Sequence, residues 1–129
     1  MEKLSTYEAD LASNLSAARG YHHRVFKFYA ERRPASLIFN VAAVSIEYYL
    51  VALCAKYQSM PLNHNYSSLI YEIEQVFPEF PEKLKVNIQR LDKIFGICSI
   101  DDYYHGTPNY HDTDNAMSIC IGLKNLFDI

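Results

Sequence analysis

Imidazole, phenol, amide and carboxylate side chains gather in residues 101 to 114, DDYYHGTPNYHDTD, around one glycine and one proline. The candidate reactive groups are those of Tyr104, His105, Asn109 and His111. Two imidazoles that titrate near neutrality can act as general acid and general base, and such a pair cleaves RNA when it is correctly placed. The alternative is that this stretch is only a polar connection between two helices.

Residues 19 to 33, RGYHHRVFKFYAERR, alternate cations with aromatic rings. Arg19, Arg24 and Lys27 are the candidate nucleic-acid contacts, because cations bind phosphates while rings such as Tyr21 and Phe26 stack on bases. In the ribonuclease hypothesis, Arg19 and Arg24 hold the phosphate backbone. A solvated helix face is the alternative interpretation of the same pattern.

A metal site is a further alternative. His22, His105, His111 and Asp112 could come together from different helices of a bundle. The adjacent His22 and His23 point about 100° apart on a helix and cannot share an ion as residues four apart do. Since no Glu-x-x-His pair occurs in the chain, we predict neither metal nor cofactor.

Other chemistries lack their signatures. No serine or cysteine follows a strand-to-helix turn, and glycines 20, 96, 106 and 122 do not form a phosphate-binding loop. Three separated cysteines, Cys54, Cys98 and Cys120, in apolar surroundings indicate reduced core thiols in a cytoplasmic protein.

The elements that must position these groups are predicted to be helices, because apolar residues recur along the chain with helical periodicity. Apolar residues at spacings of three and four predict a first helix from about Ser5 to Arg32, and Pro34 suits the first turn of a second helix that ends near Gln58. The second helix is apolar on nearly every face, which is typical of a central helix. Glu47 is the one acid within it, and pairing, an exposed edge or a functional pocket would each account for its carboxylate.

Three shorter helices follow. One covers SSLIYEIEQVF with Asn65 or Ser67 as its cap, one begins at Glu82, and the last is capped by Asp112 or Thr113. No strand pattern competes. We therefore predict an all-α fold, a single up-and-down bundle of about five antiparallel helices in one domain, residues 1–129.

Composition agrees with a globular protein of that kind. Half of the 129 residues are hydrophobic, 21% are charged and the net charge is −3. The most apolar run is broken by Asn40, Ser45 and Glu47, and the first residues lack an uninterrupted apolar segment, so we expect neither a membrane span nor a secretory signal. The eleven tyrosines and absence of Trp favour self-association through amphipathic rings.

Residues 37 to 74 resemble the HEPN superfamily (higher eukaryotes and prokaryotes nucleotide-binding). In that family a helix reading Ala/Ser-x-Glu-x-x-Leu-x-Ala-Leu precedes a turn, a His and a Leu-rich helix. The matching residues here are Ser45, Glu47, Leu50, Ala52, Leu53, His64 and Leu69. The resemblance covers about forty residues in motif and most of the chain in organisation.

The resemblance implies a homodimeric helical bundle, a nucleotidyltransferase-type partner protein and, in many members, a metal-independent ribonuclease with an Arg followed after four to six residues by a His. That pattern needs four to six residues between the Arg and the His, and only two and three lie between Arg19 and His22 or His23, so it is absent. In some non-nuclease relatives the loop before the last helix reads like Tyr-x-x-x-Arg-Tyr-Pro, where this chain has Asn109 and Tyr110. The missing Arg removes a cation that could grip phosphate.

We therefore predict a cytoplasmic, non-catalytic HEPN-like domain that homodimerises and binds a partner protein, a nucleotide or nucleic acid. The expected binding residues are Glu47, His64, Tyr104, His105, Asn109, Tyr110 and His111. The alternative is a divergent ribonuclease or toxin component of a toxin–antitoxin pair, with His105 and His111 as its catalytic residues.

Overall fold

The structure is a computed structural model that describes residues 2–61, 63, 65–91 and 109–127. Its helices are α1 (Glu2–Ala30), α2 (Ala35–Lys56), α3 (Tyr66–Val76) and α5 (Tyr110–Asn125), and residues 82–91 are also helical. No strand occurs within these described ranges. The predicted all-α class is confirmed.

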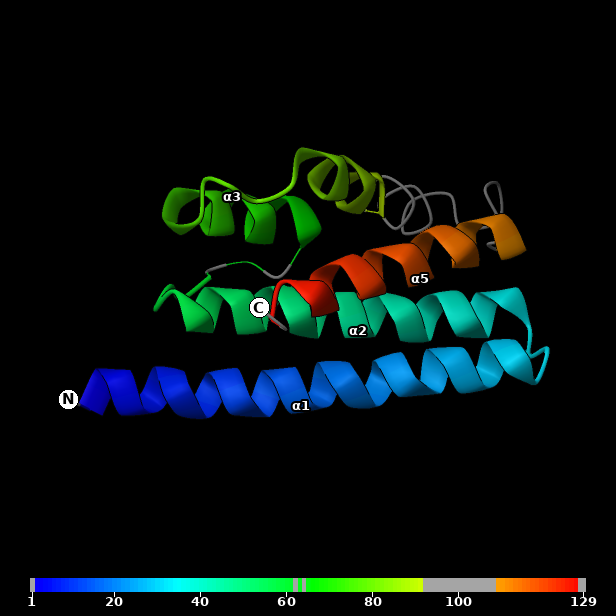
Figure 1. The fold of residues 1–129 in the computed structure, drawn as a ribbon, viewed down its shortest axis with the longest axis horizontal. Coiled ribbons are helices and arrows are strands. Elements are labelled where there is room, and N and C mark those ends of the chain that lie inside the picture. Colours follow the sequence, from blue (N-terminus) through cyan, green and yellow to red (C-terminus); the bar gives the residue numbers. More distant parts are fainter. Residues whose placement is uncertain (1, 62, 64, 92–108, 128–129) are drawn as a thin grey trace.

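The two longest helices, α1 and α2, lie side by side and run in opposite directions (Figure 1). A tight turn joins them: Arg32 adopts a left-handed conformation with φ 59°, and the N–H of Arg33 donates to the carbonyl of Phe28 at 3.0 Å. This bond satisfies a carbonyl that the end of α1 leaves without a helical partner. Pro34 then fixes the backbone immediately before α2 begins.

Close approach of the two helices depends on small residues. Ala18 and Ser45 are both fully buried, and the Ser45 hydroxyl donates to the Ala18 carbonyl at 2.9 Å. The hydroxyl of this buried serine is therefore satisfied by the neighbouring helix, which explains a polar side chain in the most apolar segment of the chain.

Helix α2 is the centre of the core and contacts α1, α3 and α5. Its buried residues are Ile38, Phe39, Ala42, Ala43, Ser45, Ile46, Tyr49, Leu50, Ala52, Leu53, Cys54 and Ala55. By length and composition alone α2 could also cross a membrane. Its burial against three helices accounts for the same composition, as the core helix of a bundle requires.

Helix α3 packs on one side of α2. Asn65 caps it, with its side-chain oxygen accepting from the N–H of Ser68 at 2.8 Å, as predicted. The Tyr66 hydroxyl donates to the Ala43 carbonyl at 2.9 Å, and Tyr57 stacks on Phe77 beyond the end of α3. These contacts fix both ends of α3 to α2.

Helix α5 begins at Tyr110, before the predicted caps Asp112 and Thr113. Asn109 is the cap: it accepts from the N–H of Asp112, whose carboxylate accepts from the N–H of Asn109. This reciprocal capping box corrects the predicted start. Tyr110 lies near the start of α2 and Phe127 packs on Tyr49, so α5 runs in the same direction as α2. The predicted antiparallel arrangement therefore holds for α1 and α2 but not for α2 and α5.

Candidate functional site

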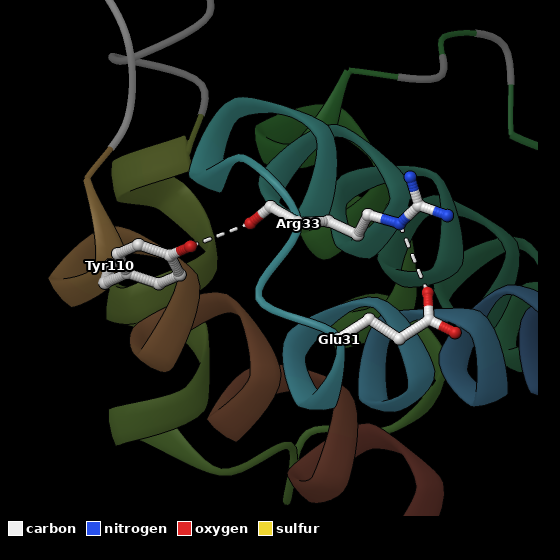
Figure 2. A network of polar contacts seen from close by, with 3 residues as sticks. All are labelled: Glu31, Arg33 and Tyr110. Carbon is white, nitrogen blue, oxygen red and sulfur yellow. Dashed lines mark hydrogen bonds and ion pairs between the residues drawn. The ribbon is translucent and has the colours of Figure 1, made fainter.

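The described part of the candidate loop, residues 109 and onward, supports the fold. The Tyr110 hydroxyl donates to the Arg33 carbonyl at 2.8 Å, which connects the start of α5 to the turn between α1 and α2 (Figure 2). Within that turn, the Arg33 guanidinium pairs with Glu31 at 3.2 Å. Asn109 and Tyr110, predicted to bind a ligand, thus both have structural contacts, and the Tyr110 ring is still 42% exposed.

His111 is exposed and contributes to a cavity of about 200 Å³ between α2, the 82–91 helix and α5. The polar residues of its lining are Asn87, Arg90, His111, Asp112 and Asn115. The structure thus places one predicted imidazole beside an arginine. His64, Tyr104 and His105 lie outside the described residues, so the predicted pairing of His105 with His111 stays a prediction.

Glu47 is half-buried on the open side of α2. Asn40, one heptad earlier, is exposed on the same side. Water reaches part of a half-buried side chain, which reduces the cost of burying its charge.

Arg19 and Arg24, two of the candidate nucleic-acid contacts, do not share one surface. Arg24 lies over the Tyr21 ring at 5.2 Å, and Tyr21 stacks on Tyr48 of α2 with 5.7 Å between ring centroids. Arg19 instead lines a cavity with His22. Residues five apart on a helix point about 140° apart, which explains why Arg19 and Arg24 reach different flanks of α1.

The cavity beside Arg19 has a volume of about 320 Å³ and lies between α1, α2 and α5. It is lined by Arg19, His22, His23, Phe26, Tyr49 and Lys124. No carboxylate is among these residues, and apart from the two cations the lining consists of aromatic and imidazole rings. Helical spacing of positions 19, 22, 23 and 26 could have indicated a common flank of α1, but nothing local in the sequence points to Tyr49 or Lys124.

His22 connects this cavity to the core. The side chain is only 6% exposed, and its Nδ1 lies 2.8 Å from the hydroxyl of the fully buried Tyr49. The ring also stacks on Phe26 with 5.1 Å between centroids. The other ring nitrogen, Nε2, is buried and has no hydrogen-bond partner among the residues that the structure describes.

Electrostatics favours a neutral His22. Burial lowers the pKa of its imidazole, and the nearby positive charge of Lys124 lowers it further. A neutral imidazole carries its proton on one nitrogen only. If the Tyr49 hydroxyl donates to Nδ1, then Nε2 carries the proton and is the buried donor that lacks an acceptor.

Within the described ranges, no group of three or more His, Cys, Asp or Glu side chains is arranged to hold a metal ion. Cys54 and Cys120 are buried free thiols, as the sequence predicts, and burial raises the pKa of each to about 12. Thiols that stay protonated at neutral pH are poor nucleophiles and poor metal ligands.

An apolar stripe runs along the open side of α2. Its members are Leu37, Val41, Val44, Tyr48 and Val51, with successive spacings of four, three, four and three. Leu37 is 40% and Val44 is 39% exposed, and the other three are half-buried. Asn40 and Glu47 border the stripe on one side, and Tyr21 of α1 continues it through its stacking on Tyr48.

Comparison of the chain with protein-family models, with curated proteins and with solved structures finds no match. The HEPN resemblance therefore rests on the sequence motif alone and stays a prediction.

Proposed function

We propose that this chain is a non-catalytic, HEPN-like helical domain that homodimerises and acts in the cytoplasm by binding. The observation that carries the proposal is the apolar stripe of α2. A helix that already buries twelve residues in its own core still carries five more apolar residues on its remaining side, of which Leu37 and Val44 are exposed and the other three are half-buried against the core. Apolar patches with a polar border are typical of protein–protein interfaces.

The spacing of the stripe favours a second copy of the same helix. Alternating steps of four and three place side chains on one seam, so that two such helices can interlock as knobs into holes. A two-fold dimer pairs the same surface of both subunits. Val44 is the central member, and its side chain would lie close to the symmetry axis.

The decisive experiment is a comparison of two valines with nearly equal exposure. Val44 is 39% exposed on the stripe, whereas Val86 is 38% exposed on the 82–91 helix. We expect the wild-type protein and Val86→Glu to sediment as dimers, and Val44→Glu as a folded monomer, because a two-fold interface would bring two buried carboxylates together. A monomeric wild-type protein, or equal behaviour of the two variants, contradicts the proposal.

A nucleotidyltransferase-type partner protein or a nucleotide is the expected ligand of the dimer. Binding is favoured over catalysis because two described residues of the candidate loop, Asn109 and Tyr110, already support the fold. A divergent ribonuclease is the alternative, and the shared cavity of Arg90 and His111 favours it. RNA cleavage by the purified protein that is lost in His111→Ala would establish a ribonuclease in place of a binding domain.

A further inference from the structure

The two borders of the α2 stripe carry opposite charges. Glu47 lies on one border and is half-buried there. The other border is formed by α1, where the guanidinium carbon of the exposed Arg24 lies 5.2 Å from the centre of the Tyr21 ring. Tyr21 stacks on Tyr48, which is a member of the stripe and the direct neighbour of Glu47. Arg24 and Glu47 therefore lie at nearly the same level along α2, on opposite sides of its apolar residues.

Helical geometry places these borders on either side of Val44. Ser45 points about 100° away from Val44 and donates to the carbonyl of Ala18, so α1 covers that side of α2. Glu47 points about 60° away from Val44 in the other direction. Positions that flank the apolar seam of paired helices carry the charges that set partner choice and orientation. Since α1 covers one flank of α2, the charge on that flank comes from Arg24.

We propose that the dimer pairs its two α2 helices in parallel, with Arg24 of each subunit bound to the partner's Glu47. A two-fold axis that runs along α2 turns each border toward the opposite border of the partner at the same level, so two such pairs form. An antiparallel pairing about Val44 turns each border toward the same border of the partner, and like charges then face each other. This inference rests on the proposed homodimer and adds its orientation.

Each side chain can form this pair while it keeps the contacts that it already has. A guanidinium on an aromatic ring still has N–H groups at its edge that can donate to a carboxylate. Glu47 interacts within its own chain, and its two carboxylate oxygens offer about four acceptor positions. The pairing therefore does not require that Glu47 lack other partners. Because Arg24 is exposed, the pair lies at the rim of the interface, where charges determine orientation more than affinity.

Cysteine cross-linking in a Cys98→Ser background measures the orientation, since Cys54 and Cys120 are buried. Parallel pairing places residue 37 beside residue 37 of the partner, so oxidation of Leu37→Cys should give disulfide-linked dimers. Antiparallel pairing about Val44 separates the same two positions by about 21 Å, because each lies seven residues from the axis.

The control for chance collision is Val86→Cys, which is 38% exposed outside the stripe, against 40% for Leu37, and should stay unlinked. Linkage only in a mixture of Leu37→Cys and Val51→Cys would overturn the parallel arrangement and leave the dimer intact, because these positions meet only in antiparallel helices. A wild-type dimer whose variants do not link in either experiment would also overturn it. A wild-type protein that sediments as a monomer would contradict the proposed dimer itself, and this arrangement with it.

Charge reversal tests the paired residues. Arg24→Glu and Glu47→Arg should each raise the Kd of the dimer at least about tenfold, because two attractions become two repulsions. The double variant restores opposite charges across the axis and should have a Kd within about threefold of the wild type. Lys83→Glu, which reverses an exposed cation on the 82–91 helix, is the matched control and should leave the Kd unchanged within the same limit. An unchanged Kd in Arg24→Glu, at an exposed position that tolerates substitution, would contradict the pairing.

Discussion

Low pH should lower the unfolding free energy of this protein through protonation of His22, and the surroundings of the imidazole give the direction of the effect. Among the described residues, the charged groups beside the imidazole are Arg19 on its own helix and Lys124 on α5, while α2 contributes the neutral Tyr49. Burial first, and Lys124 second, lower the pKa of His22 from its ordinary value of 6.5. The unfolded chain therefore binds this proton more readily than the folded chain, and stability must fall as the pH drops through 6.5.

The upper limit of the effect follows from the unfolded state alone. If His22 stays neutral in the folded protein throughout, lowering the pH from 7.5 to 5.5 costs about 1.4 kcal/mol of unfolding free energy through this one group. The loss is smaller if the folded-state imidazole begins to bind its proton within that window. Above pH 7.5 the contribution of His22 to stability is fully present.

Urea unfolding of the wild-type protein and His22→Phe at pH 7.5 and 5.5 measures this contribution. The variant loses the contact with Tyr49 at both pH values, so only the difference between the two pH values is informative. The unfolding free energy that the variant loses between pH 7.5 and 5.5 should be smaller than the loss of the wild type by up to about 1.4 kcal/mol. His23→Phe, which replaces the exposed neighbouring imidazole, is the matched control and should keep the wild-type difference.

An equal pH dependence in the wild type and His22→Phe would refute this reasoning. The reasoning would also fail if the wild-type protein exceeded His22→Phe in unfolding free energy by more at pH 5.5 than at pH 7.5. The second result would mean that the charged imidazole has an anionic partner, and the cavity would then hold a negative charge that its described lining does not supply.

Two further changes separate structural roles from chemical ones. Asn109→Ala should lower the unfolding free energy by about 1 kcal/mol, because the capping box is lost. The control Asn115→Ala, at an exposed position inside α5, should be neutral or stabilising. Equal effects of the two substitutions in urea unfolding would contradict the capping role. In a Cys98→Ser background, iodoacetamide at pH 7.5 should alkylate Cys54 and Cys120 only after unfolding, because burial raises the pKa of both thiols to about 12. Mass spectrometry measures the labelling, and rapid labelling of the native protein would contradict this prediction.

The sequence predicted the helices because their burial is one-sided and periodic, and α2 as the central helix because it is apolar on nearly every face. It missed the start of α5, since Asn109 and Asp112 are both good capping residues and only their reciprocal bonds decide between them. It did not indicate the cavity beside His22. The contact of His22 with Tyr49 spans 27 positions, and Lys124 lies a further 75 positions beyond Tyr49, so only the packing of three helices brings them together.

The geometry of α1 and α2 keeps the cavity beside His22 apart from the α2 stripe. On α1, Arg19 lies on the cavity flank, whereas Tyr21 and its stacked Arg24 lie beside the α2 stripe. On α2, Tyr49 faces the cavity and its neighbour Tyr48 belongs to the stripe, because consecutive residues of a helix point about 100° apart. A second subunit on the stripe would therefore leave the cavity open to solvent.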